Sequence, residues 1–546
     1  MKADFCTVKL TAGGAPVSLK VETETHSGLA TVCLLREADR VCVTMTPAVP
    51  VRVEALSLTL TEDFQSAGHV FLNGWQSWTD SRELPPDAKM RGLHAAPKAL
   101  VKKYALDGSG DYRFTSYPNK KGRLHGWSYG YTRRGGRFSL FASLSEKNGF
   151  TRFVTDAAHN TLTAEKETCA RQYPAGEMVT LMEVFLAEGT EDEVFDRWFS
   201  ALGIPAPTVP PITGYTSWYR HYQEIDEEKL LSDLRGVKTC GFPFEIFQID
   251  DGWEEKVGDW LRVDKTKFPR GMRAVRDEIA EAGLEPGLWL APFVCERDST
   301  ILREHPDWFL RDETGTYVTG GPNWSGVCSL DFYNDEAREY VRETLRTATE
   351  DWGFKFLKLD FLYAACQFPR PDKTRGEIMC EAMEFIRACT PGVRLLGCGV
   401  PLMPAFGLVD YCRIGCDVGL DWDDKWWMRL LHRERVSTKN SLLNSVFRRE
   451  LSSRAFLCDP DVFILRAEGN ALTETQRETL AAINAICGGV LFTSDDPGVY
   501  NEKQKTLLRE MQVLRGARLL DAREDGGELT LRFTADGRES SRSFQL

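Results

Sequence analysis

The chain has 546 residues, of which 42% are hydrophobic and 27% charged, and its formal net charge is -12. Such a composition is typical of a soluble globular protein of two or three domains that can bury a sizeable core. The acidic balance argues against a nucleic-acid partner, which needs a positive field, and no apolar run has the length of a membrane span or the form of a signal peptide.

The first part of the chain, 1–190, is predicted to form a β-sandwich domain. Short alternating runs such as VSLKVET and RVCVTMT are separated by Gly, Pro, Asp and Asn turns, the pattern of many short strands in stacked sheets. The next segment, 191–211, is predicted to be a helix and a linker. Its helical part, within EDEVFDRWFSALG, ends at glycine, and the proline-rich stretch IPAPTVPPITG that follows marks the clearest domain boundary.

Residues 212–501 are predicted to form a (β/α)8 barrel, because apolar strands alternate with amphipathic stretches such as DEAREYVRETLRTATEDWG. A doubly wound sheet is disfavoured, since no GxGxxG motif opens a helix after the first strand. The expected strands are 214–220, 244–253, 285–293, 354–361, 394–401, 411–417, 455–464 and 488–496. The tail, 502–546, begins as a helix and ends in strand-like runs, which predicts a small C-terminal antiparallel β-domain. The predicted fold class is therefore α/β, with a central TIM barrel between two β-domains.

Polar and aromatic residues follow the expected strands, at the end of the barrel where functional residues lie. Carboxylates dominate this set, which holds one lysine and one arginine but no histidine: Trp218, Asp250, Asp251, Trp289, Lys358, Asp360, Cys398, Arg413, Asp417, Asp459, Asp461, Asp495 and Asp496. Glycoside hydrolysis requires such a site, with one carboxylate as acid and another as nucleophile or base. The 8 dispersed histidines, without a CxxC, HxH or HExxH motif, predict no metal site and no cofactor.

Two pairs of residues indicate how this site would work. Lys358 and Asp360 are two apart on one strand, so both side chains face the same side of the wall, and the ammonium would keep the carboxylate ionised. Arg413 and Asp417 leave the sixth strand together, where desolvation and a second carboxylate would raise the pKa of an acid/base. Arg413 would hold sugar hydroxyls or orient a carboxylate, because a guanidinium does not release its proton.

Each position also has a purely structural interpretation, which the sequence leaves open. An Asp at a strand end is often the N-cap of the next helix, and this alternative is strongest for Asp459, Asp495 and Asp496. Lys358 has the alternative of a structural ion pair. Cys398 taken alone is expected to be a small buried hydrophobe, and the tryptophans have the alternative of core packing.

A series of motifs runs through the chain from position 73 to about 461. The motifs are NGWQSW (73–78), SWY (217–219), FEIFQIDDGW, GDW (258–260), GLWLAPF, HPDW (305–308), FLKLDFLYA, LLGCGVPLMPA, RIGCD and LCDPD. In these motifs and in its predicted domain order the chain resembles the bacterial α-galactosidases of glycoside hydrolase family 36. The pairing of KxD on one strand with RxxxD two strands later is the most specific part of the resemblance. The short C-terminal domain and the stretch DVGLDWDDKWW (417–427) depart from the family pattern, so the leaving-group preference is not implied.

The resemblance implies a role for four carboxylates. Asp360, in KLDF, would be the nucleophile that forms a covalent glycosyl-enzyme. Asp417, in RIGCD, would be the acid/base that protonates the leaving oxygen and later activates water. Asp250 and Asp251 would bind the O4 and O6 hydroxyls of galactose and select its axial O4.

The same resemblance implies five further contacts with the sugar. Lys358 and Arg413 would bind hydroxyls beside the nucleophile and the acid. Cys398 would lie near O2, and Trp289 would pack against the ring. Trp78 would reach in from the N-terminal domain and close the subsite.

The function expected from this resemblance is retaining hydrolysis of terminal α-linked galactose from oligosaccharides, such as melibiose and raffinose, by double displacement. Two alternatives use the same scaffold: an α-N-acetylgalactosaminidase, which needs space for a 2-acetamido group near Cys398, and a galactosyl-transferring enzyme similar to raffinose synthases. A non-catalytic sugar-binding protein is disfavoured because both carboxylates are present. A Schiff-base aldolase is disfavoured because the carboxylates around Lys358 would suppress its free amine.

The expected partner is a small α-galactoside, with no nucleic acid and no membrane, and a homo-oligomer remains open. The 15 cysteines show no paired spacing, and several lie in apolar runs. Free thiols of this kind indicate a reducing compartment, so we expect a cytoplasmic location.

Overall fold

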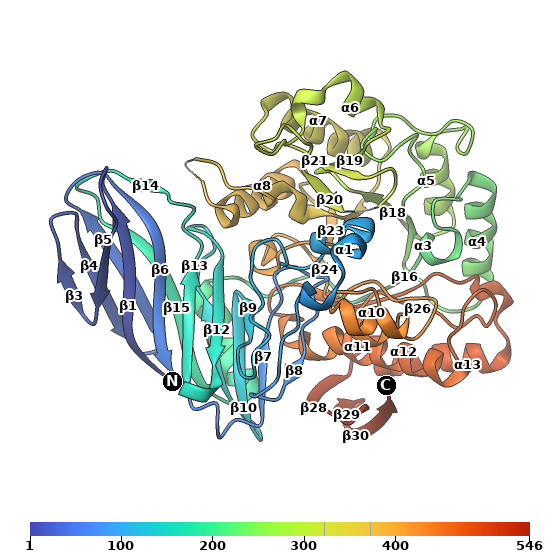
Figure 1. Ribbon diagram of the computed structural model, residues 1–546. Coiled ribbons are helices and arrows are strands. Elements are labelled where there is room, and N and C mark those ends of the chain that lie inside the picture. Colours follow the sequence, from blue (N-terminus) through green and yellow to red (C-terminus); the bar gives the residue numbers. More distant parts are fainter. Residues whose placement is uncertain (322, 372) are drawn as a thin grey trace.

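The N-terminal part of the computed structural model, which describes residues 1–321, 323–371 and 373–546, consists of two stacked antiparallel sheets (Figure 1). One sheet contains β1 (Lys2–Thr11), β2 (Val17–Val21), β6 (Val51–Thr61), β9 (His125–Trp127), β12 (Thr151–Asp156), β13 (Thr161–Lys166) and β14 (Gln172–Tyr173). The other contains β3 (Glu24–His26), β4 (Ala30–Glu37), β5 (Arg40–Pro47), β7 (His69–Leu72), β8 (Glu83–Leu84), β10 (Tyr129–Arg134), β11 (Arg137–Ser143) and β15 (Val179–Gly189). Alternate residues along β12 and β13 are buried, as in strands that present one face to a shared core.

The helix predicted after the sandwich is α2 (Glu191–Leu202). Thr190 and Glu193 form a capping box at its start, and Gly203 ends it with a φ of 67°, a left-handed conformation that glycine adopts without strain. Its apolar face, which includes Trp198, is buried in the core that the barrel shares.

The central sheet is the predicted barrel. Its strands are β16 (Ile212–Thr216), β17 (Ile246–Ile249), β18 (Glu285–Leu290), β22 (Phe356–Leu359), β23 (Arg394–Gly397), β24 (Tyr411–Arg413), β25 (Leu457–Asp459), β26 (Val462–Phe463) and β27 (Val490–Thr493). Every pairing in this sheet is parallel, and each strand overlaps a segment expected from the sequence. The fold class predicted from the sequence is therefore confirmed.

The barrel closes through a broken seventh strand. β25 pairs with β24, β26 pairs with β27, and the chain passes from β25 to β26 through Pro460 and Asp461. Proline cannot donate a ladder hydrogen bond, and Asp461 has a φ of 76°, which costs a non-glycine residue about 1–2 kcal/mol. The break therefore follows from the local sequence, and it changes the direction in which the Asp461 side chain points.

Helices follow the barrel strands, and most of them cover the outside of the barrel (Figure 1). They are α3 (Trp218–His221), α4 (Glu227–Thr239), α5 (Met272–Glu281), α6 (Thr300–Glu304), α7 (Asp335–Arg346), α8 (Arg375–Cys389), α9 (Leu402–Ala405), α10 (Trp426–Leu431), α11 (Thr438–Phe447), α12 (Glu474–Cys487) and α13 (Glu502–Leu514). Several begin at a residue whose side chain accepts a backbone N–H, such as Asp226 of α4 and Asn334 of α7.

Two small sheets and one helix lie outside these layers. β19 (Val294–Glu296), β20 (Thr319–Gly321) and β21 (Val327–Ser329) form an insertion between β18 and α7. β28 (Arg518–Asp525), β29 (Glu528–Ala535) and β30 (Arg538–Gln545) form the C-terminal antiparallel sheet. The short helix α1 (Lys98–Tyr104) leaves the sandwich and lies over the barrel (Figure 1). The division into 1–190, 191–211, 212–501 and 502–546 stays a prediction.

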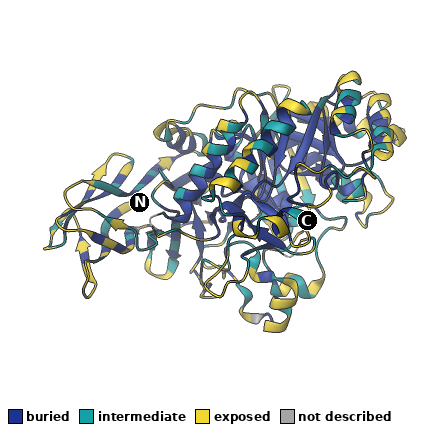
Figure 2. Ribbon diagram, turned by 90° about the horizontal axis from the view of Figure 1, so that it is seen from above, coloured by how far each residue is buried: buried dark blue, intermediate teal, exposed yellow. Residues whose placement is uncertain are grey.

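One hydrophobic core extends from the barrel into the near half of the sandwich. It unites barrel residues such as Trp289 with the sandwich residues Phe71, Trp75 and Tyr129, whereas the far half of the sandwich has its own core. Figure 2 shows the buried residues concentrated in the barrel and the exposed ones at the periphery. Among the described residues, no helix is long and apolar enough to cross a membrane.

Candidate active site

A cavity of about 440 Å³ opens at the carboxyl ends of the barrel strands. The predicted site residues that line it are Trp78, Asp250, Asp251, Trp289, Lys358, Asp360 and Asp417. The other two, Cys398 and Arg413, are buried and contact residues of the lining. The structure thus brings all nine predicted residues to one place, which strand-end position alone does not guarantee.

Asp360 follows β22 and is held by two donors. The Trp289 indole Nε1 donates to Oδ2 over 3.1 Å, and the backbone N–H of Phe361 donates to Oδ1 over 2.9 Å. Phe361 has a φ of 52°, a strained conformation for a bulky residue. The carboxylate is 7% exposed, so it faces the cavity in a fixed orientation.

Lys358 lies two residues before Asp360, but its direct partner is Asp250. The ammonium Nζ donates to Asp250 Oδ2 over 3.0 Å, and the same oxygen also accepts from Gln248 Nε2 over 2.6 Å. Burial alone would lower the pKa of Lys358, but the Asp250 and Asp360 carboxylates raise it above its ordinary value. The lysine therefore stays charged and cannot supply a free amine.

Asp251, beside Asp250, is held by two different donors. Trp324 Nε1 donates to Oδ2 over 2.8 Å, and Gln223 Nε2 lies 3.1 Å from the same oxygen. Burial raises the pKa of Asp251, while hydrogen bonds, including one with the buried Glu254 carboxyl, oppose that rise. The two neighbouring aspartates therefore differ in their hydrogen-bond donors: Asp250 accepts from an ammonium and an amide, and Asp251 accepts from an indole and an amide.

Asp417 is held by Arg413. The guanidinium Nη1 donates to Asp417 Oδ1 over 2.9 Å, and the Asp417 side chain is 44% exposed at the cavity. Desolvation in the cleft raises the pKa of Asp417; the positive charges of Arg413 and Lys358 oppose this, while nearby carboxylates support it. Two nearby carboxyls with different environments are the arrangement in which acid and nucleophile roles separate.

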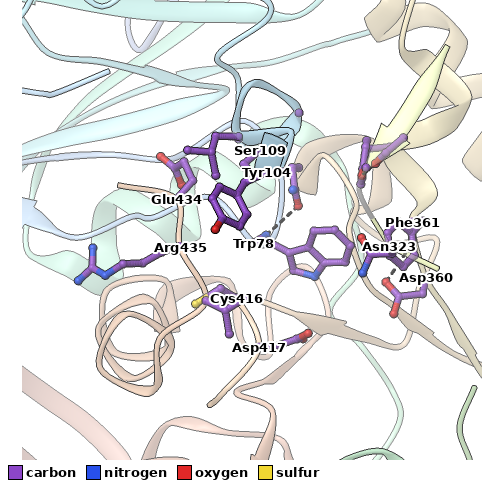
Figure 3. A pocket seen from close by; sticks show the side chains of 18 of the residues that line it. Trp78, Tyr104, Ser109, Asn323, Asp360, Phe361, Cys416, Asp417, Glu434 and Arg435 are labelled. Carbon is purple, nitrogen blue, oxygen red and sulfur yellow. Dashed lines mark hydrogen bonds between the residues drawn. The ribbon is translucent and has the colours of Figure 1, made fainter. Parts of the chain in front are cut away.

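Trp78 enters the cavity from the sandwich. Its indole Nε1 donates to Cys398 Sγ over 3.3 Å, and its ring meets Phe361 edge-on with centroids 5.1 Å apart. A Cβ at Gly399 would lie 2.8 Å from the Trp78 ring, so glycine is needed there. Figure 3 shows the indole between Asp360 on one side and Arg435 on the other.

The chain is similar to known proteins in sequence and in fold. The Melibiase family model matches residues 210–385. The fold superposes with a TM-score of 0.71 and 29% identity on an α-galactosidase from Thermus thermophilus solved with p-nitrophenyl α-D-galactopyranoside, over 98% of each chain. In the matched region and in its fold the chain is thus similar to known α-galactosidases. It has the same fold as the glycoside hydrolase family 36 enzyme AgaB of Geobacillus stearothermophilus, at 14% identity and a TM-score of 0.63 over 95% of this chain and 72% of that one.

Curated relatives match shorter segments of the chain. α-Galactosidase AgaA of Geobacillus stearothermophilus is 28% identical over 153 residues, which cover 26% of this chain and 20% of that protein. α-Galactosidase Mel36A of Lactobacillus acidophilus is 35% identical over 101 residues, 17% of this chain and 13% of that protein. The chain therefore aligns with a fifth or less of the length of these two relatives.

The outer part of the cavity was not predicted from the sequence. It is lined by residues of two loops that carry no barrel strand: Tyr104, Leu106, Ser109, Asp424, Met428, His432, Glu434, Arg435 and Val436. The loops adjoin, since the Tyr104 and Trp427 rings lie 6.4 Å apart. The position of barrel strand ends does not predict such residues. The one sequence signal was that the stretch 417–427 departs from the family pattern.

Of the remaining strand-end aspartates, two have structural roles. Asp496 caps a short turn by accepting from the Gly498 N–H over 2.9 Å. Asp495 accepts from Tyr500 Oη over 2.6 Å and pairs with Arg466. Neither is among the described residues that line the cavity, so the N-cap interpretation holds for Asp496 and a structural one for Asp495.

Proposed function

We propose that this protein is a retaining α-galactosidase of glycoside hydrolase family 36, with Asp360 as nucleophile and Asp417 as acid/base. One observation carries the proposal: a carboxylate fixed by two donors and a second carboxyl with a raised pKa line the same cavity. Glycoside hydrolysis with retention needs such a pair. The likeness to the Thermus thermophilus enzyme, solved with an aryl α-galactoside, supports the choice of sugar.

The proposed reaction has two displacements. In the first, Asp360 attacks the anomeric carbon while the proton on Asp417 moves to the leaving oxygen, so the glycosidic bond breaks as the glycosyl ester forms. In the second, Asp417 takes a proton from water, the water oxygen attacks the anomeric carbon, and Asp360 is released as a carboxylate. Each role agrees with the local contacts, since Asp360 is oriented by fixed donors and Asp417 carries the raised pKa.

Recognition of galactose is proposed to rest on Asp250, Asp251 and Lys358. The Lys358–Asp250 pair leaves the ammonium charged, and hydroxyl oxygens would complete its hydrogen bonds. Trp289 is proposed to pack on the sugar, as its place in the lining allows. Arg413 is proposed to act through Asp417, because its guanidinium already pairs with three carboxylates.

Galactose is favoured over N-acetylgalactosamine by the wall that Trp78 and Cys398 form. This wall is proposed to face O2, where the Trp78 ring, whose Nε1 donates to the Cys398 Sγ over 3.3 Å, would take the space that a 2-acetamido group needs. Cys398 is itself 1% exposed. Melibiose and raffinose, which carry terminal α-galactose, are the proposed substrates, and a cytoplasmic location is proposed because the described cysteines are free.

Azide rescue tests the proposal. Wild type, Asp360→Ala and Asp417→Ala are assayed with p-nitrophenyl α-galactoside, with and without azide. We expect rapid release by wild type, loss of activity in Asp360→Ala, and recovery by azide with formation of the β-galactosyl azide, because azide enters from the face that the nucleophile has vacated.

Two other outcomes would change the assignment. Release from the N-acetylgalactosaminide but not from the galactoside would keep the barrel chemistry and refute the sugar. Transfer of galactose to an added sugar at low concentration, in preference to water, would make the protein a transferase.

A further inference from the structure

Asp461 lies behind the proposed acid/base, at the break in the seventh barrel strand. It is 1% exposed and has a φ of 76°. A strained residue of this kind persists where surrounding contacts hold it. The contacts of the Asp461 side chain therefore indicate which interactions the strained backbone makes possible.

Those contacts converge on Asp417. Asp461 Oδ1 lies 2.8 Å from Nη2 of Arg413, whose Nη1 donates to Asp417. Asp461 Oδ2 accepts from the backbone N–H of Val418 over 2.8 Å, and Val418 is the residue after Asp417. One carboxylate thus holds both the guanidinium partner of Asp417 and the backbone that carries Asp417.

Two neighbours fix Asp461 in turn. Tyr219 Oη donates to Oδ2 over 2.5 Å, and Asp461 donates its own N–H to Asp459 Oδ1 over 2.9 Å. Asp459 Oδ2 accepts from Arg413 Nε over 2.9 Å. The guanidinium is therefore bound on three sides, and only its Asp417 contact reaches the cavity lining.

We propose that Asp461 is a positioning residue for the acid/base: it fixes the Arg413 guanidinium and the Val418 amide, and through them sets the place and the protonation of Asp417. This inference rests on the proposed function and extends it to a residue outside the cavity. It also explains the broken strand, since the turn at Asp461 directs the side chain toward Val418.

The electrostatic consequence has a definite sign. Burial and the carboxylates of Asp417 and Asp459 raise the pKa of Asp461 to about 6, against the Arg413 charge. The interaction between two charges is mutual, so ionised Asp461 raises the pKa of Asp417. Removing that charge lowers the pKa of Asp417, and a freed Arg413 would lower it further.

The other charged and titratable groups around the pair come from several elements. They are Tyr219 and Tyr222 at α3, Asp250 after β17, Lys358 and Asp360 at β22, Cys398 after β23, Arg413 and Cys416 at β24, and Asp459 of β25. The substitution Asp461→Asn, which tests the proposal, changes none of these groups. A shift of the pH profile therefore reports the loss of the Asp461 carboxylate.

The test is Asp461→Asn, assayed with a good leaving group, 2,4-dinitrophenol, and a poor one, methanol, as their α-galactosides. General-acid help matters for the poor leaving group, so we expect kcat/KM for the methyl galactoside to fall about 10- to 100-fold and that for the dinitrophenyl galactoside much less. The acid must be protonated, so the alkaline limb of the pH profile moves to lower pH.

Asp495→Asn is the matched control, because Asp495 is also a buried aspartate paired with an arginine at a strand end. It is expected to lower stability without moving the pH limb or the leaving-group ratio. A folded Asp461→Asn protein whose leaving-group dependence and alkaline pH limb equal those of wild type would overturn the proposal. If Asp461→Asn does not fold, Tyr219→Phe, which removes one hydroxyl from Asp461, must give a smaller shift in the same direction. Failure of wild type on every α-galactoside would instead refute the proposed function.

Discussion

The charge of Lys358 bears on Asp417 as well as on its direct partner Asp250. The ammonium lowers the pKa of Asp417, against the rise that desolvation causes. The lysine thus has two separable effects at the residue scale: it keeps Asp250 paired, and it limits how far the pKa of Asp417, the proposed acid/base, rises.

Replacing Lys358 by methionine should separate these effects. Loss of the positive charge raises the pKa of Asp417, so the alkaline limb of kcat/KM should move to higher pH, opposite to the shift expected for Asp461→Asn. The unpaired Asp250 should reduce kcat by about 10²-fold or more. Lys355→Met, at an exposed lysine three residues earlier, is the control and should change neither quantity. An unmoved limb in Lys358→Met would contradict the electrostatic account.

Gly399 makes room for the Trp78 ring. Its φ is 56°, and an added Cβ would meet the indole at 2.8 Å and the Phe361 backbone N at 3.1 Å. We expect Gly399→Ala to displace Trp78 and reduce kcat/KM by about 10- to 100-fold, as small misplacements in an active site do. Gly392→Ala, with a φ of 69° and nothing within 4 Å, carries the same backbone cost without the contact. Equal kinetics for both variants would show that Trp78 is not displaced.

Among the described α-helices, α1 and α10 differ from the others because neither contains a buried residue. They flank the outer cavity, where Tyr104 is 41% exposed and lies near the Trp427 ring. An aromatic wall of this kind suits the leaving group of the substrate, since its apolar face can pack on a ring.

Tyr104→Ala should therefore weaken binding of substrates with a large leaving group. We expect KM for p-nitrophenyl α-galactoside to rise about threefold to tenfold, the equivalent of one aromatic contact. KM for α-galactosyl fluoride, whose leaving group does not reach this wall, should stay unchanged and serves as the internal control. A parallel rise for both substrates would place Tyr104 in galactose binding or in folding.

The barrel strands were predictable because buried parallel strands are short apolar runs bounded by turns and helices. The break within 455–464 was not, since Asp459-Pro460-Asp461 was interpreted only as a strand end. The predicted site residues share the cavity because strand ends of a barrel converge. Trp324 and Glu254, which contact Asp251, lie on loops whose path no periodicity gives.

Across the whole molecule, Arg448 joins the sandwich to the barrel. It is fully buried, and its guanidinium donates to Asn73 Oδ1 over 2.9 Å, to Ser77 O over 2.6 Å and to Ile414 O over 2.9 Å. The first two acceptors belong to the segment that carries Trp78, and the third belongs to the barrel. The same two regions share one hydrophobic core.

Arg448→Met should lower the free energy of unfolding by about 3 kcal/mol or more, because several buried acceptors lose their donor at once. Thermal unfolding followed by tryptophan fluorescence and by circular dichroism should show a lower midpoint, with the two signals still coinciding. Arg532→Met, at an arginine that is 52% exposed in the C-terminal sheet, should leave the midpoint nearly unchanged. Separate transitions for the two signals in wild type would contradict a shared core.

The position of Trp78 has a consequence for recombination between relatives. The Trp78 indole of the sandwich fills the space beside Gly399 of the barrel, and Arg448, the residue after α11, donates to Ser77 O in the same segment. A chimera that exchanges the sandwich alone would keep only one partner of each of these contacts. The tryptophan of the new sandwich would then not fit against the barrel residues. We therefore expect a chimera to keep activity only when residues 73–78 and the barrel residues that contact them come from the same parent protein.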